Sequence, residues 1–252
     1  MSNIRIIARL DIKGPNLIKG VQLEGLRVIG NPNNFATKYY EDGIDEIIYM
    51  DAVASLYGRN SLSSLLEKTI DNVFVPITVG GGIRNLDDVR KLLRSGADKV
   101  AINTGAVKNP NLIKDIINEI GSQSLVLSVE AKKVKEGQWN VFIDGGREPT
   151  NIDIFRWIEK SIDFGIGEIF LTSIDRDGTR KGFDLELINK VSTKFDVPII
   201  ASGGMGKLEH FKEVCEIGLA DAVAIGTLLH YADMSISQIK AFAKTNNINI
   251  RA

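Results

Sequence analysis

The stretch V-P-I-T-V-G-G-G-I-R at residues Val75–Arg84 decides the fold of this chain. It is a short apolar run that ends in glycines. About one helix of chain separates it from a second apolar run, which ends at Asn103-Thr104. A strand, a helix and a second strand in this order form a βαβ unit, in which the two strands are parallel. The stretch therefore predicts a parallel sheet with helices packed on it.

The same unit returns in the second half of the sequence. The run V-P-I-I-A-S-G-G-M at Val197–Met205 repeats the first one, and its second apolar run ends at Gly226-Thr227. Pro76 and Pro198, which follow a valine in each copy, are 122 residues apart. We interpret this spacing as two copies of half a domain.

Short apolar runs alternate with helix patterns along the whole chain. Eight such runs predict strands at Ile4–Leu10, Glu46–Met50, Ile77–Val79, Lys99–Ile102, Leu125–Val129, Glu168–Leu171, Ile199–Ala201 and Ala222–Ile225. Eight βα units in 252 residues match the size of a closed (βα)8 TIM barrel, an α/β fold. We predict one barrel domain at residues 1–252, with half-barrels at about 1–122 and 123–252. An open doubly wound sheet is the alternative, but it explains neither the eight units nor the repeat.

Composition narrows the class of protein. The 31 basic and 32 acidic residues leave a net charge of −1, which argues against a nucleic-acid surface. No run approaches the roughly 18 apolar residues of a membrane span, and the start of the chain lacks the apolar core of a signal peptide. The single cysteine, Cys215, lies in a helix pattern and is expected to be a buried structural thiol. We expect a cytoplasmic protein that binds neither membrane nor nucleic acid.

Two insertions interrupt the βα alternation. The stretch from Ile12 to about Pro32 is rich in glycine and asparagine, and we expect a loop that acts as a lid or a binding loop. The stretch Lys132–Gly146 predicts a small hairpin that turns near Glu136-Gly137. Both insertions follow predicted strands at the end where barrels carry their functional groups.

Glycines and small polar residues follow the strands of both βαβ copies. Such turns let backbone N–H groups approach an anion, and the loops after strands seven and eight are the usual phosphate site of this fold. The matching positions are Ser202-Gly203-Gly204 and Gly226-Thr227 in one half, and Gly81-Gly82 and Asn103-Thr104 in the other. A ligand with a phosphate at each end would then span the barrel mouth. The alternative is that these glycines only make tight turns.

Asp11 and Glu130 occupy matching positions in the two halves, so we expect them to face each other across the mouth. Two carboxyls in a partly enclosed cavity can take different protonation states and divide general-acid and general-base roles. The alternative is a helix cap, or a salt bridge to Lys13 or Lys132. His210 and His230 show no metal-ligand spacing, so no metal site is expected.

Charged residues also stand early in four predicted strands, at Arg5, Glu46, Lys99 and Glu168. They should meet at the opposite end of the barrel, where single buried charges are costly unless they pair. Physical chemistry alone favours a stabilising ring of salt bridges there. The alternative is a polar gate for something that enters from below.

Several stretches resemble the HisF family, the cyclase subunit of imidazole glycerol phosphate synthase, over essentially the whole chain. They are R-I-I-A-x-L-D at Arg5–Asp11, V-G-G-G-I-R at Val79–Arg84, G-A-D-K-V-A-I-N-T at Gly96–Thr104, L-T-S-I-D-R-D-G-T at Leu171–Thr179, and I-A-S-G-G at Ile200–Gly204. The run at Leu171–Thr179 is highly specific. It separates this family from its sister, the ProFAR isomerase HisA.

The resemblance implies a (βα)8 barrel without a cofactor, paired as a heterodimer with a HisH-type glutaminase. Ammonia from that partner would pass up the barrel to the bisphosphorylated substrate PRFAR and give imidazole glycerol phosphate and AICAR, in histidine biosynthesis. The family's catalytic carboxyls match Asp11 and Glu130. Its phosphate and substrate contacts match Lys19, Gly82, Asn103, Thr104, Asp177, Gly178, Gly203, Gly204 and Gly226. Its ammonia gate matches Arg5, Glu46, Lys99 and Glu168, and Asp98 matches a residue that faces the glutaminase.

Four features near the mouth depart from the family pattern. Glu130 stands for aspartate, Arg9 for cysteine and Asp144 for histidine, and Lys13–Gly20 reads K-G-P-N-L-I-K-G for K-D-G-R-V-V-K-G. The intact gate beside this altered mouth supports a second hypothesis, in which a HisF-like paralogue and a HisH-like glutaminase deliver ammonia to a sugar amidotransferase that makes acetamidino groups on surface polysaccharide. Binding of a phosphate ligand without chemistry is a third, which the symmetric carboxylates disfavour.

Overall fold

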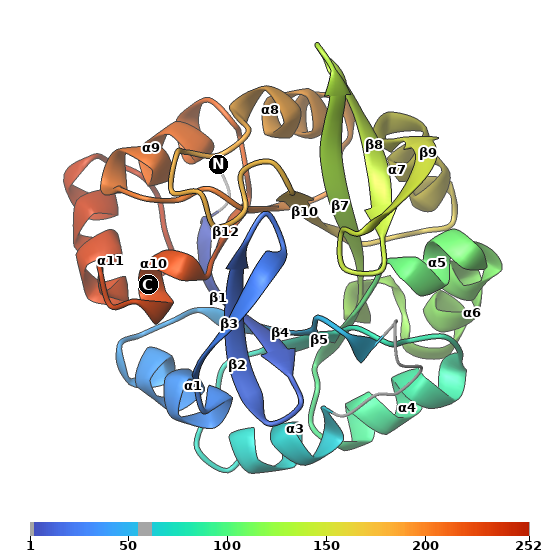
Figure 1. Cartoon of the computed structure of the whole chain (residues 1–252), viewed down its shortest axis with the longest axis horizontal. Helices are drawn as coiled ribbons and strands as arrows, with labels where there is room; N and C mark the ends of the chain where they lie inside the picture. The colour runs from blue at the N-terminus through green and yellow to red at the C-terminus, as the bar shows by residue number, and fades with distance from the viewer. Residues whose placement is uncertain (1–2, 55–61, 252) are drawn as a thin grey trace.

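Parallel strands close into a barrel in the computed structural model, which describes residues 3–54 and 62–251 (Figure 1). Each strand pairs with the next along the chain, and β12 returns to pair with β1. The barrel strands are β1 (Arg5–Lys13), β4 (Glu46–Asp51), β5 (Ile77–Gly80), β6 (Lys99–Ile102), β7 (Leu125–Lys135), β10 (Glu168–Ser173), β11 (Ile199–Ser202) and β12 (Ala222–Ile225). The prediction of a (βα)8 barrel is confirmed, and all eight predicted strands are present.

Helices follow the strands and form the outer layer. They are α1 (Pro32–Glu41), α3 (Ser63–Thr69), α4 (Leu86–Arg94), α5 (Thr104–Lys108), α6 (Asn111–Ile120), α7 (Ile154–Asp163), α8 (Leu185–Lys194), α9 (Leu208–Glu216), α10 (Thr227–His230) and α11 (Ile236–Thr245), with a 3-10 turn at Ser122–Ser124. Asn85 caps α4 by accepting the backbone N–H of Asp88 at 2.9 Å. Cys215 lies in α9, where it is half-buried rather than buried, and burial raises the pKa of its thiol to about 12. It is therefore an uncharged thiol, in agreement with a structural role.

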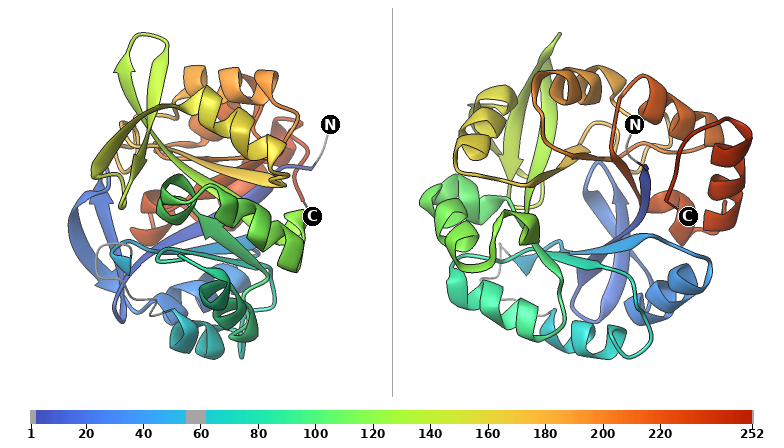
Figure 2. Two further views of the ribbon diagram at one scale, coloured as in Figure 1. Left: turned by 90° about the vertical axis from the view of Figure 1, so that its right-hand side faces the viewer. Right: turned by 180° about the vertical axis from the view of Figure 1, so that it is seen from behind.

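The two insertions form antiparallel hairpins on one end of the barrel (Figures 1 and 2). The first is β2 (Asn16–Val21) with β3 (Glu24–Gly30), and the second is β8 (Gln138–Ile143) with β9 (Glu148–Asp153). Each hairpin pairs with a barrel strand that continues past its predicted end, as β1 does to Lys13 and β7 does to Lys135.

The hairpins correct one sequence expectation and confirm another. The loop expected at Ile12–Pro32 is instead largely a hairpin, because Leu17 and Ile18 are buried and pair in register with the extension of β1. The predicted hairpin turning near Gly137 is confirmed: it joins the end of β7 to β8, with φ of 68° at that glycine. Each half of the chain thus begins with a long strand and an antiparallel hairpin, while the half-barrel division itself stays a prediction.

Two hydrophobic layers hold the barrel. The outer one lies between the strands and the helices, and residues of β1 that point outward, such as Ile6 and Leu10, belong to it. The inner one fills the barrel and includes Ile7, Ile48 and Phe170. Because side chains alternate along a strand, residues 5, 7, 9 and 11 of β1 share the inward face. The inner apolar layer therefore separates Arg5 at one end of the barrel from Arg9 and Asp11 at the other.

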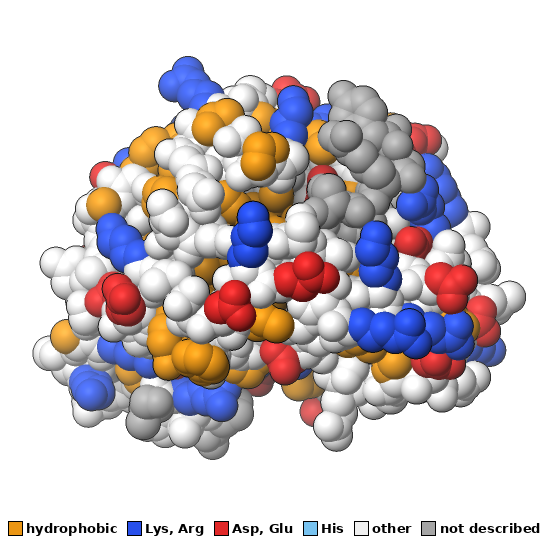
Figure 3. All heavy atoms as spheres, turned by 90° about the horizontal axis from the view of Figure 1, so that it is seen from below, with side chains coloured by type: hydrophobic (Ala, Val, Ile, Leu, Met, Phe, Trp, Pro, Cys, Tyr) orange, Lys and Arg blue, Asp and Glu red, His pale blue; other side chains and the backbone are white. Residues whose placement is uncertain are grey.

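The two ends of the barrel differ in what they carry. Figure 2 shows the hairpins at one end and both ends of the chain at the opposite end. Figure 3 shows that acidic and basic side chains are interspersed over the flank covered by α1, α3 and α4. Across residues 3–54 and 62–251, the helices are too short or too polar to span a bilayer.

Candidate functional site at the barrel mouth

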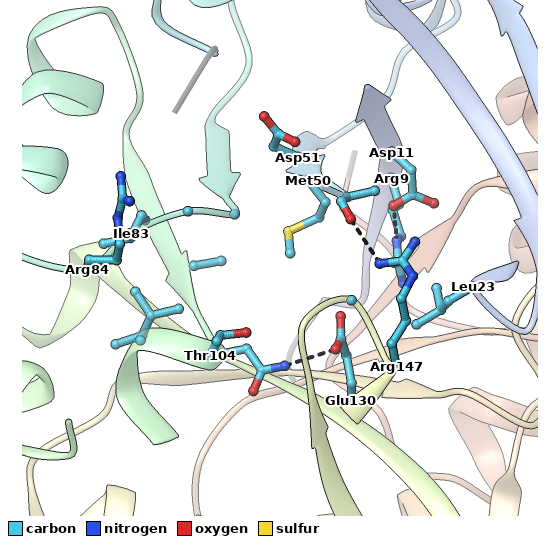
Figure 4. A pocket seen from close by; sticks show the side chains of 18 of the residues that line it. Arg9, Asp11, Leu23, Met50, Asp51, Ile83, Arg84, Thr104, Glu130 and Arg147 are labelled. Carbon is cyan, nitrogen blue, oxygen red and sulfur yellow. Dashed lines mark hydrogen bonds and ion pairs between the residues drawn. The ribbon is translucent and has the colours of Figure 1, made fainter. Parts of the chain in front are cut away.

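The hairpin end of the barrel holds two neighbouring cavities. The larger, of about 220 Å³, is lined by six of the predicted site residues: Asp11, Lys19, Gly82, Asn103, Thr104 and Glu130 (Figure 4). The smaller, of about 20 Å³, is lined by Lys19 and by the remaining predicted mouth residues: Asp177, Gly178, Gly203, Gly204 and Gly226. The barrel therefore brings together all the mouth residues singled out in the sequence. Lys19 and Arg9 line both cavities.

Asp11, near the end of β1, is held between two cations. Arg9 Nε donates to one carboxylate oxygen at 2.9 Å, and Lys19 Nζ donates to the other at 3.1 Å. Burial alone would raise the pKa of Asp11, but the charges of Arg9 and Lys19 outweigh it and hold the pKa well below its ordinary value. Asp11 is therefore a carboxylate at neutral pH. Arg9 and Lys19, rather than Lys13, are therefore the salt-bridge partners of Asp11.

Glu130, on β7, has the opposite ionisation behaviour. Asn103 Nδ2 donates to its Oε2 at 3.0 Å. Burial raises the pKa of Glu130 to about 7, opposed by the charge of Arg9 and the backbone N–H of Gly146 and reinforced by the charge of Asp11. Near neutral pH the cavity thus holds one carboxylate and one carboxyl that carries its proton about half the time.

Arg9 is the main residue of the site that sequence reasoning did not assign a role. Its side chain is buried, and Nη1 donates to Thr172 Oγ1 at 3.0 Å and to Ser202 Oγ at 3.2 Å. The guanidinium also lies 5.4 Å from the ring centroid of Phe170. The period-two alternation of β1 could have found it, because position 9 shares a face with Asp11.

Three further cations line the larger cavity: Arg84, Lys108 and Arg147. Lys108 Nζ lies 3.4 Å from Asp144 Oδ2, and the Asp144 N–H donates to Thr104 Oγ1 at 3.0 Å. The aspartate that departs from the family pattern is therefore built into the end of the cavity that contains Thr104. A positive lining of this kind suits an anionic ligand.

The smaller cavity has a backbone wall that only glycine can form. Gly203 and Gly204 have φ of 98° and 112°, in the left-handed region. A Cβ at Gly204 would lie 2.1 Å from the carbonyl oxygen of Gly182. Thr227 Oγ1, which lines the same cavity, is buried without a hydrogen-bond partner in the described part of the chain. A ligand in this cavity can thus approach the backbone of the wall closely and hydrogen-bond to the hydroxyl of Thr227.

The opposite end of the barrel holds the four charged residues that begin the strands. Arg5 Nη1 lies 2.9 Å from Glu46, Arg5 Nη2 lies 2.5 Å from Glu168, and Lys99 Nζ lies 2.8 Å from Glu168. These ion pairs link all four residues, in agreement with the salt-bridge ring expected from physical chemistry. Asp98 lies exposed beside it and accepts the backbone N–H of Ile77 at 2.7 Å.

Comparisons with known proteins agree with the geometry. A family model described as "Histidine biosynthesis protein" matches residues 5–235. A protein of Legionella pneumophila named "Imidazole glycerol phosphate synthase subunit HisF" is 65% identical over 211 residues, which cover 84% of this chain and all of that protein. Proteins with the same name from Endomicrobium trichonymphae and Streptococcus mutans are 44% and 42% identical over 251 and 247 residues. They cover 100% and 98% of this chain, and 96% and 98% of their own lengths. The chain therefore belongs to the HisF family.

Proposed function

We propose that this chain is the cyclase subunit of imidazole glycerol phosphate synthase, which uses ammonia to convert PRFAR to imidazole glycerol phosphate and AICAR. The observation that carries the proposal is the pair of Asp11 and Glu130, which share one cavity and differ in ionisation. Relatives of 65% and 44% identity that are named as subunits of this synthase support it. Their names favour this function over the sugar-amidotransferase alternative.

The two carboxyls divide the proton transfers of the reaction. Glu130, protonated up to about pH 7, donates a proton to the oxygen that leaves as water when ammonia adds to the substrate carbonyl. Asp11, ionised in the free enzyme, accepts a proton from the attacking nitrogen, gives it to the nitrogen of AICAR as that product leaves, and accepts a proton again as the ring closes. The elimination that releases AICAR uses the same acid and base.

The two phosphates of the substrate occupy the two ends of the mouth. Gly82, Asn103 and Thr104 bind one of them in the larger cavity. The other requires the smaller cavity, where Gly203, Gly204, Gly226, Asp177 and Gly178 form the wall and Lys19 supplies positive charge. Anchoring both ends places the reacting carbon between Asp11 and Glu130.

Ammonia enters from the opposite end, from a HisH-type glutaminase that docks there as a heterodimer. Arg5, Glu46, Lys99 and Glu168 form the gate, and Asp98 faces the partner. The apolar layer above the gate, which includes Ile7 and Phe170, suits an uncharged small molecule. Deprotonated ammonia is the form that such a layer would pass.

The test is turnover of PRFAR with ammonium salt and without a partner. Formation of imidazole glycerol phosphate is expected, and Asp11→Asn should lower its rate by about 10²–10⁴-fold, because one proton-transfer group is lost. Absence of product at high enzyme concentration would overturn the proposal. Growth of a histidine auxotroph that lacks its own HisF, when supplied with this chain, would count against the sugar-modifying alternative.

A further inference from the structure

We propose that Arg9 is a positioning residue: its guanidinium fixes the Asp11 carboxylate at the barrel mouth and forms the wall between the two cavities. The inference rests on the proposed function for its kinetic consequences. Its structural part stands on the contacts of Arg9 alone.

The contacts of Arg9 fix the guanidinium in one orientation. Nε donates to Asp11, and Nη1 donates to Thr172 on β10 and Ser202 on β11. The planar group is also packed over Phe170, which belongs to the inner apolar layer. The guanidinium is planar and rigid, and it makes three hydrogen bonds while it packs on the Phe170 ring. No other orientation of similar energy would keep all of these contacts. Asp11 therefore has a partner on its own strand, β1, that is held in place by contacts with β10 and β11.

Arg9 also determines the balance of charge at the mouth. Three carboxyls interact with its positive charge, those of Asp11, Asp177 and Glu130. Lys19 is the second cation of this group and bonds to both Asp11 and Asp177. His230 lies behind the cluster, where burial lowers the pKa of its ring to about 4, so it is neutral near pH 7. Arg147 contributes a weaker positive charge toward Glu130. Without Arg9, Lys19 alone would balance the charges of Asp11 and Asp177.

This arrangement assigns a specific consequence to the loss of Arg9. An opposite charge within about 4–6 Å lowers the pKa of a carboxyl by about 1–3 units, so Asp11 should titrate at higher pH without it. The charge of Arg9 also lowers the pKa of Glu130, so that carboxyl should hold its proton to a higher pH. The acid limb and the alkaline limb of a pH–rate profile would therefore both move to higher pH.

The experiment compares Arg9→Met, which removes the charge at similar length, with Arg9→Lys, which keeps the charge but loses the fork. Carboxyl ¹³C NMR of aspartate-labelled protein follows Asp11, assigned with Asp11→Asn. In the unaltered protein Asp11 should stay ionised over the whole folded pH range. In Arg9→Met its midpoint should rise by about 1–3 pH units, and in Arg9→Lys the rise should be smaller.

The kinetic readout is the pH dependence of kcat and KM for PRFAR, with free ammonia held constant. Arg9→Met should show a new fall in kcat on the acid side, and an alkaline fall displaced above about pH 7. A merely structural role would lower the rate by one factor at every pH. An Asp11 titration unchanged in Arg9→Met, or a profile of unchanged shape, would overturn the inference.

A second variant keeps the test decisive if Arg9→Met does not fold. Thr172→Val with Ser202→Ala removes both hydroxyl partners of Nη1 and leaves all charges in place. A guanidinium free to swing from Asp11 should raise the Asp11 midpoint, and no rise would contradict the positioning role. If the unaltered protein makes no imidazole glycerol phosphate, the proposed function fails, while the NMR titration still decides the role of Arg9.

Discussion

Two carboxyls in one cavity titrate apart because their neighbours differ, although burial acts on both. Asp11 has two cations at hydrogen-bonding distance, whereas Glu130 accepts from uncharged donors, the side-chain amide of Asn103 and the backbone N–H of Gly146. Desolvation is therefore overcome at Asp11 and prevails at Glu130. Asp11 and Glu130 therefore differ in ionisation because their hydrogen-bonding partners differ in charge.

The raised pKa of Glu130 predicts a cost in stability at alkaline pH. The folded state holds the proton up to about pH 7, whereas an ordinary glutamate loses it near 4.5, so stability falls as pH rises between these values. Glu130→Gln removes the ionisation and should raise the free energy of unfolding at pH 8, by at most about 3 kcal/mol. At pH 4, where both forms are protonated, it should change little.

Thermal unfolding at pH 4 and pH 8 checks this prediction, with an expected rise in Tm of several degrees at pH 8 alone. The same variant should lose PRFAR turnover by about 10²-fold or more, since an amide cannot donate the proton. An equal change in Tm at both pH values would show that packing rather than ionisation is responsible.

The sequence predicted the paired positions of Asp11 and Glu130 because the half-length repeat relates them. It did not predict which of them would be ionised, because Lys19 reaches Asp11 from the β2–β3 hairpin and Asn103 reaches Glu130 from the turn after β6. Those contacts depend on how separate elements meet in space. Arg9 was visible as an unusual residue, but its partners Thr172 and Ser202 are 163 and 193 residues away.

At the scale of elements, the β2–β3 hairpin is docked on the segment that follows β10. The Gln22 N–H donates to the Asp177 carbonyl at 2.8 Å, and Lys19 Nζ lies 2.8 Å from the Asp177 carboxylate. Gly178 packs directly beneath, where a Cβ would lie 2.4 Å from the carbonyl oxygen of Gly20. The hairpin and this segment together bound the smaller cavity.

Gly178→Ala should lift the hairpin from this segment, because the new methyl group meets the Gly20 backbone and φ is 72° there. We expect KM for PRFAR to rise by about tenfold, the equivalent of about 1.4 kcal/mol. Faster proteolysis within β2–β3 should accompany the change. Both are measured on the isolated chain with ammonium salt.

Gly25→Ala is the matched control for this variant. Gly25 lies in the same hairpin with φ of 61°, but a Cβ there would meet no heavy atom within 4 Å. It carries the same backbone strain without the clash, so KM should stay near that of the unaltered protein. Equal effects of the two substitutions would show that strain, not docking, sets KM.

This hairpin was the part of the fold that the sequence predicted least well. Its glycines and asparagines are typical of a loop, and of its apolar side chains between Asn16 and Gly30 only Leu17 and Ile18 are buried. What makes β2 a strand is the extended edge of β1, with which it pairs from Asp11 to Lys13. The pairing of the end of β7 with β8 was predicted because Glu136-Gly137 forms a recognisable turn between two runs of strand-forming residues.

At the scale of the whole molecule, an apolar layer inside the barrel separates its charged mouth from the charged residues at the opposite end. We call this opposite end the floor; it consists of Arg5, Glu46, Lys99 and Glu168. Glu168 is central to the floor, because it pairs with both Arg5 and Lys99. Closure of the sheet brings together strands that lie 163 residues apart at Arg5 and Glu168. The sequence predicted this meeting correctly because each residue begins a barrel strand.

Glu168→Gln should separate the two sources of ammonia. It leaves two cations of the floor with a weaker partner, and should cost about 1–3 kcal/mol of stability, less than for a fully buried pair. Turnover with a glutaminase partner and glutamine should fall by about tenfold relative to turnover with ammonium salt, which enters from the open mouth.

Glu186→Gln provides the control, since Glu186 also pairs with two lysines, Lys133 and Lys190, but on the exposed surface. It should change neither the stability nor the ratio of the two rates by a measurable amount. A Glu168→Gln variant that keeps the same ratio as the unaltered protein would contradict a role of the floor in ammonia transfer.

The position of the chain ends has a practical consequence for anyone who labels or immobilises this protein. Arg251 donates its backbone N–H to the Ile4 carbonyl at 3.0 Å, and its side chain lies 3.7 Å from Glu46, at the rim of the floor. An affinity tag or fluorescent protein fused to either terminus would therefore occupy the surface proposed for the glutaminase and could be mistaken for weak assembly. The turn at Glu136-Gly137, on the opposite end of the molecule, is the better place for a reporter.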